Sequence, residues 1–194
     1  SDVWAQLCDR YKPTIAYAPN ASGMAQRSLY SVAYALYIRT LSGEALEKSL
    51  GERYFSADNL SDRRSALGII TRNQMISAQF RDEILQHFFA QWQSQALVID
   101  LWFNLQAQSP VYDIEALHKL VSHPSFDMKN PNRVRSIYGV FAMLNNRRFH
   151  ALDGSGYEFM GQAVAKLDEL NPQIASRLAT PLARFGRYDS KRQG

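Results

Sequence analysis

Two arginines and one glutamine, placed near predicted helix starts, are the side chains of this sequence best suited to binding chemistry. Gln173 and Arg177 stand four residues apart, which puts both on one face of a helix. Arg135 follows another predicted helix start. An amide and a guanidinium placed in this way can hold a peptide backbone or a carboxylate through hydrogen bonds. The same pattern is also typical of a solvated helix surface, so both interpretations stay open at this point.

The histidines do not form a recognisable metal motif. His118 and His123 are five residues apart, whereas helical zinc motifs such as His-Glu-x-x-His place two histidines on one face with a spacing of four. No such motif occurs in the chain. We therefore expect no metal ligands in this chain, and we interpret each histidine as a surface or half-buried polar residue.

The sequence also offers no complete set of catalytic groups, so we expect no catalytic residue in this chain. Ser155 lies between two glycines, but the pattern is not Gly-x-Ser-x-Gly and no strand precedes it. A tight turn, with glycine supplying a positive φ, is the better interpretation. Cys8 has no neighbouring base and is expected to be a small buried side chain. A single cysteine cannot form an internal disulfide, which favours a reducing compartment.

Composition is that of a globular protein, with 46% hydrophobic and 21% charged residues among 194. The net charge of +4 raises the possibility of nucleic-acid binding. However, the basic residues occur as scattered pairs with acids between them, which argues against a phosphate-binding surface. No apolar run reaches the length needed to span a membrane, so no membrane partner is expected.

Apolar residues recur with helical spacing along most of the chain, which predicts an all-α fold. The stripes are Tyr30–Ala33–Tyr34–Tyr37–Leu41, Ile84–Leu85–Phe88–Phe89–Trp92, Val134–Ile137–Tyr138–Phe141–Leu144 and Met160–Ala163–Val164–Leu167–Leu170. Residues 97–105 are apolar almost all round; a strand is possible there, but the flanking pattern favours a buried central helix. Each stripe needs a partner surface, so the helices must stack on one another.

Helix starts are marked most clearly at Asn130-Pro131 and Asn171-Pro172, where asparagine can cap an orphan N–H and proline leaves none unpaired. Ser22, Ser42 and Ser61 are weaker cap candidates. Proline at position 181 should interrupt the last helix.

Short helices in antiparallel succession indicate a bundle or a superhelical, α-solenoid-like array of helical repeats. No linker divides the chain, so we expect one helical unit over residues 1–194. From these features alone, a free-standing α-solenoid module that binds protein or RNA is also possible.

Several segments resemble, in order, the last domain of bacterial aminopeptidase N, the alanyl aminopeptidase. These segments are ADNLSD (57–62), WFNLQA (102–107), FDMKNPNRVRS (126–136), FHALDGSGY (149–157), NPQIASRL (171–178) and RYDSKRQ (187–193). The resemblance covers the chain from about residue 55 to its end and is weaker before that. Several long motifs in the right order are specific in a way that one short pattern is not.

The resemblance implies a function for the whole protein and a supporting role for this chain. Members of the family are cytoplasmic zinc aminopeptidases that release N-terminal residues from peptides, and their zinc ligands lie in an upstream domain. The chain would then be an inactive fragment of the superhelical C-terminal domain, which closes the active-site chamber against the upstream catalytic domains. Gln173 and Arg177 match positions that face peptide substrates in the family, and Arg135 matches an arginine on an inner helix.

Overall fold

The computed structural model describes residues 2–14 and 17–190. All regular structure in these two ranges is helical, which confirms the all-α prediction. No helix in them is both long enough and apolar enough to cross a bilayer. The chain divides into two compact groups, residues 1–87 and 88–194, and each is described by itself. The single unit expected over residues 1–194 stays a prediction.

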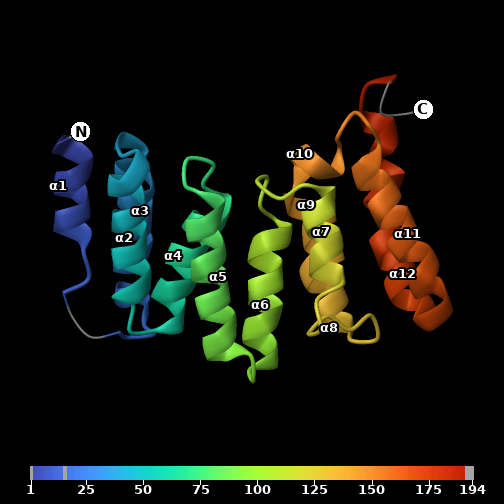
Figure 1. The fold of residues 1–194 in the computed structure, drawn as a ribbon, viewed down its shortest axis with the longest axis horizontal. Helices are drawn as coiled ribbons and strands as arrows, with labels where there is room; N and C mark the ends of the chain where they lie inside the picture. The colour runs from blue at the N-terminus through green and yellow to red at the C-terminus, as the bar shows by residue number, and fades with distance from the viewer. Residues whose placement is uncertain (1, 15–16, 191–194) are drawn as a thin grey trace. The chain divides into compact units, whose positions relative to one another are not determined.

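The first group consists of paired helices (Figure 1). Its elements are α1 (Asp2–Tyr11), α2 (Ala21–Tyr37), a 3₁₀ turn (Ile38–Thr40), α3 (Gly43–Phe55), α4 (Leu60–Arg72) and the beginning of α5 (Ala78–Trp92). Helix α1 packs against α2, and α3 packs against α4. The apolar stripe predicted for α2 turns inward, since Ala33 and Tyr34 are buried.

A half-buried arginine joins the helices of this group. The guanidinium of Arg53 lies 4.1 Å from the ring centroid of Tyr34 and 4.8 Å from that of Tyr30. Its Nη2 atom donates to the hydroxyls of Ser31 and Ser65. Burial lowers the pKa of Arg53 from its ordinary value. Cation–π contacts and hydroxyl acceptors thus take the place of water around this charge.

The second group contains the shorter helices. After the end of α5 come α6 (Ala96–Ala107), α7 (Ile114–Val121), α8 (Pro131–Val134), a π-helical segment (Arg135–Gly139), α9 (Val140–Leu144), α10 (Asn146–Phe149), α11 (Ser155–Leu170), α12 (Pro172–Ala179) and a 3₁₀ segment (Leu182–Arg187). Helix α6 confirms the helix expected over residues 97–105, and its Ile99 and Phe103 are almost fully buried.

Aromatic side chains fill the core of the second group. The ring of Phe159 on α11 lies 5.1 Å from that of Tyr138 and 5.5 Å from that of Phe141, measured between centroids. Phe149 meets Phe141 edge to face at 5.7 Å. These distances are those at which aromatic pairs add to the free energy of simple burial. These ring contacts therefore join the π segment to helices α9, α10 and α11.

The asparagines predicted the helix starts more accurately than the serines did. Asn130 and Asn171 cap α8 and α12 as predicted, and each is followed by proline at the first helical position. Ser42 stands at the N-cap of α3, although its side chain makes no capping hydrogen bond. Helix α12 ends at Ala179, before the proline that was expected to stop it.

Two serine caps were predicted wrongly. The N-cap of α2 is Asn20, whose Oδ1 accepts from the Gly23 amide at 2.8 Å, so Ser22 lies inside the helix. Likewise Asn59 caps α4, where its Oδ1 accepts from the Asp62 amide at 2.9 Å and displaces Ser61 from that role. An asparagine two residues earlier already satisfies the free amide of the third residue of each helix.

The Asp153–Gly156 segment is the tight turn expected from its glycines. Gly154 has a φ of 75°, in the left-handed region that glycine adopts without strain. Ser155 donates both its amide and its hydroxyl to Asp153 Oδ1, at 3.0 and 2.6 Å. These bonds lower the pKa of the Asp153 carboxyl. The serine hydroxyl is therefore part of the turn and the start of α11.

Candidate functional site

The π segment interrupts the run of helix from Pro131 to Leu144 and is the element on which Arg135 stands. In it the Val140 amide bonds to the carbonyl of Arg135, five residues back. The buried Ser136 hydroxyl donates to the Arg133 carbonyl at 2.7 Å, which gives that carbonyl a partner where the hydrogen-bond pattern changes. Such π turns are often found at functional sites. The sequence predicts an uninterrupted helix here, and the π segment departs from it.

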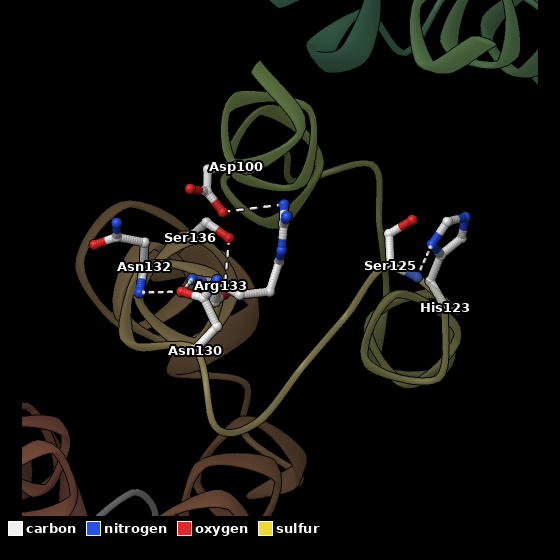
Figure 2. Close-up of polar contacts among 7 residues, drawn as sticks. All are labelled: Asp100, His123, Ser125, Asn130, Asn132, Arg133 and Ser136. Carbon is white, nitrogen blue, oxygen red and sulfur yellow. Dashed lines mark hydrogen bonds and ion pairs between the residues drawn. The ribbon is translucent and has the colours of Figure 1, made fainter. Parts of the chain in front are cut away.

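Arg133 anchors this helix to α6. One of its terminal nitrogens lies 3.0 Å from Asp100 Oδ1, and the two side chains are only 9% and 16% exposed. The guanidinium carbon also lies 5.2 Å from the ring centroid of Phe103. Figure 2 shows the Arg133 side chain extending away from its own helix toward Asp100. This ion pair was not foreseen from the sequence.

The start of the same helix is fixed by Asn130. Its Oδ1 accepts from the amides of Asn132 and Arg133, at 3.0 and 3.3 Å (Figure 2). Proline at the next position holds a helical φ. The short helix α8 is therefore held at its first turn as well as through the Arg133 side chain.

His123 lies beside this anchor and is held as a neutral group. Its Nδ1 accepts from the Ser125 amide at 3.1 Å, and its ring meets that of Phe89 edge to face at 4.9 Å. Burial, and then the charge of Arg133, lower the pKa of His123 below its ordinary value. The half-buried polar position expected for this histidine is confirmed.

The three predicted site residues are all exposed. Arg135 projects from the π segment, and Gln173 and Arg177 share the outer face of α12. The opposite face of α12 is buried through Ile174, Ala175 and Leu178. Within residues 2–14 and 17–190, none of the three side chains has a hydrogen bond or ion pair. Their polar groups therefore keep their capacity to bind an external group.

A glycine places the π segment against α12. A Cβ atom on Gly139 would lie 3.8 Å from Arg135 Cβ and 3.8 Å from Leu178 Cδ2. The structure thus brings the element that carries Arg135 into contact with the helix that carries Gln173 and Arg177. The arrangement can supply two guanidiniums and an amide, which suit peptide carbonyls and carboxylates.

The described residues do not fit a zinc centre. Within them, no three side chains of histidine, cysteine, aspartate or glutamate come together as metal ligands. Three or four such ligands are needed for a protein zinc site.

Comparisons with known proteins agree with the resemblance noted above. The chain is 43% identical over 143 residues to aminopeptidase N of Haemophilus influenzae, which is 73% of this chain and 16% of the relative. It is 43% identical over 145 residues to aminopeptidase N of Escherichia coli, covering 74% of this chain and 16% of the relative. The Caulobacter vibrioides aminopeptidase N is 31% identical over 173 residues, 89% of this chain and 20% of the relative.

A solved structure is similar over nearly all of the chain. The crystal structure of Legionella pneumophila aminopeptidase A in complex with aspartic acid matches 98% of this chain and 23% of that one, with a TM-score of 0.85 and 26% identity. The chain thus spans about a sixth to a quarter of the proteins it matches. The family model described as "Domain of unknown function (DUF3458_C) ARM repeats" matches residues 1–194. This chain therefore belongs to the DUF3458_C family of ARM-repeat domains.

Proposed function

We propose that this chain is the C-terminal cap domain of a zinc-dependent aminopeptidase that releases N-terminal residues from peptides. The observation that carries the proposal is its 43% identity to two proteins named aminopeptidase N, of each of which it covers only 16%. A match of that extent is expected of one domain of a longer enzyme. The absence of a zinc-ligand cluster among the described residues is compatible with this division of labour.

Zinc and the catalytic residues would lie in the upstream catalytic domains of the same polypeptide, and the cytoplasm is the proposed location. When bound there, zinc supplies the activation of a water molecule for attack on the scissile carbonyl. This chain would contribute orientation of the peptide and exclusion of larger proteins from the chamber. Holding a substrate in a reactive geometry is itself a large part of enzymatic rate enhancement.

Arg135, Gln173 and Arg177 are the residues proposed to contact the peptide. Each is exposed and its side chain has no internal partner within residues 2–14 and 17–190, so hydrogen bonds to a peptide would cost no existing contact. The guanidiniums would bind carbonyls or the terminal carboxylate of a peptide, and the Gln173 amide can both donate and accept. These contacts would lie beyond the scissile bond, so they would matter most for longer peptides.

The proposal is tested with the complete polypeptide that contains this chain. It should release amino acids stepwise from the N-terminus of short peptides, lose that activity on treatment with a chelator, and regain it with zinc. An N-acetylated copy of the same peptide is the matched control and should not be cut. A complete polypeptide that binds no zinc and cuts neither peptide would refute the proposal.

A further inference from the structure

The buried ion pair between Asp100 and Arg133 has no role in the function as proposed so far. We propose that these two residues are positioning residues: they hold the π segment so that Arg135 meets a bound peptide. The inference rests on the proposed function, because it assigns to Asp100 and Arg133 an effect on peptide binding that passes through Arg135.

The ion pair with Asp100 fixes the direction in which the Arg133 side chain points. Arg133 is charged and buried, and Asp100 supplies a carboxylate oxygen 3.0 Å from one of its terminal nitrogens. Buried ion pairs add little net stability compared with a well-packed apolar pair, but removing one partner is strongly destabilising. The face of Phe103, 5.2 Å from the guanidinium carbon, restricts the side chain further.

The orientation of Arg133 also determines the side of the helix on which Arg135 lies. Two residues along a helix are rotated by about 200° relative to each other. Anchoring Arg133 inward against α6 therefore turns Arg135 outward, as the buried and exposed states of the two side chains confirm. The Asn130 cap and the bond from the Ser136 hydroxyl to the Arg133 carbonyl leave little freedom between them.

The π segment also contacts α12, the helix that carries Gln173 and Arg177. The π segment presents Gly139 to Leu178 on α12, with 3.8 Å between the Leu178 Cδ2 atom and the Cβ position of the glycine. A rotation of the π segment would therefore shift Arg135 and press on the buried side of α12. Its greatest effect would still be on Arg135, which stands on the segment itself.

The experiment compares the complete enzyme with its Asp100→Asn variant on two substrates, a tetrapeptide and a single-residue chromogenic amide. Asp100→Asn keeps the shape of the side chain but removes its charge. We expect kcat/KM for the tetrapeptide to fall by about five-fold or more, chiefly through KM, since a contact of about 1 kcal/mol is lost. The amide lacks the residues that would contact Arg135 under the proposed function, so its kcat/KM should change by less than about two-fold.

A double-variant cycle separates positioning from a general structural role. If Asp100 acts through Arg135, the combination of Asp100→Asn with Arg135→Ala should be no worse on the tetrapeptide than Arg135→Ala alone. Losses that multiply, or an equal loss on both substrates, would overturn the inference. If Arg135→Ala itself leaves tetrapeptide cleavage unchanged, the proposed contact fails, and the positioning role is overturned with it.

Two further variants keep the test decisive if Asp100→Asn does not fold. Ser136→Ala removes only the hydroxyl that holds the Arg133 carbonyl, and it should also lower kcat/KM for the tetrapeptide selectively. Glu115→Gln is the matched control, because it breaks the exposed Glu115–Lys119 ion pair on α7, 2.9 Å long, and should leave both substrates unaffected. Unchanged tetrapeptide cleavage in a folded Ser136→Ala variant would contradict the inference.

Discussion

Leu178 on α12 packs directly on Gly139 of the π segment, with its Cδ2 atom 3.8 Å from the place that a Cβ atom of residue 139 would take. This contact is the point at which the two elements that carry the proposed peptide contacts meet. A methyl group at Gly139 would meet Arg135 and Leu178 at ordinary van der Waals distance.

Two substitutions at Gly139 should therefore have different effects on the stability of the fold and on peptide cleavage. Gly139→Ala fits the space and reduces the freedom of the unfolded chain, so we expect it to raise the free energy of unfolding by about 0.5–1 kcal/mol. Gly139→Leu should displace α12 and reduce cleavage of a tetrapeptide by the complete enzyme. Denaturant unfolding and kcat/KM for the two variants check this. Equal tetrapeptide activity of the alanine and leucine variants would show that α12 does not depend on this contact.

The second prediction concerns the first turn of α11, where it packs on the preceding backbone. A Cβ atom on Gly156 would lie 2.4 Å from the carbonyl oxygens of both Arg148 and Phe149, so Gly156→Ala forces backbone apart. We expect it to destabilise the chain by about 1–3 kcal/mol, the range typical of overpacking.

Gly161→Ala is the matched control, because Gly161 lies in the same helix and has no atom within 4 Å of its Cβ position. It should be neutral or stabilise the chain, since alanine favours the helix. Urea unfolding of the two variants measures the difference. A Gly156→Ala variant as stable as Gly161→Ala would contradict the tight packing of this turn.

The third prediction concerns the alkaline limit of stability. Burial raises the pKa of Tyr138 to about 12, above its ordinary value of 10.0. The native state therefore favours the protonated phenol more than the unfolded state does. The stability that depends on this is fully present below pH 10 and is lost as the pH rises from 10 toward 12.

The comparison of wild type with Tyr138→Phe isolates this group, because Tyr34 and Tyr54 also have pKa values raised by burial to about 12. Unfolding free energies measured between pH 8 and 11.5 should fall less steeply in Tyr138→Phe than in the wild type. Identical slopes for the two proteins would mean that Tyr138 ionises at its ordinary pKa in the folded state.

Local signals in the sequence were enough to predict most of the fold. Asn130 and Asn171 mark helix starts because capping acts over two or three residues, and the stripes on α2 and α11 mark buried faces for the same local reason. Ser22 and Ser61 failed as cap predictions because several residue types can cap a helix, and Asn20 and Asn59 stood nearer the true starts.

The π segment and the ion pair could not be predicted in this way. The apolar stripe from Val134 to Leu144 is compatible with an ordinary α-helix, so it carries no sign of the wider turn at Arg135–Gly139. The partner of Arg133 is Asp100, which lies on a different helix, so no spacing in the sequence connects them. Exposure of Gln173 and Arg177 followed from helix periodicity, but their contact with substrate stays a prediction.

The role of Arg177 in peptide binding is tested most directly by the dependence of catalysis on peptide length in the complete enzyme with Arg177→Ala. We expect kcat/KM for a tetrapeptide to fall by about ten-fold, as for the loss of a charged hydrogen bond of about 1.4 kcal/mol, while a single-residue chromogenic amide is cut almost normally. Lys166→Ala, which removes an exposed charge from α11, is the control and should affect neither substrate. An equal effect of Arg177→Ala on the tetrapeptide and the amide, or no effect on either, would contradict the claim that this domain binds the peptide.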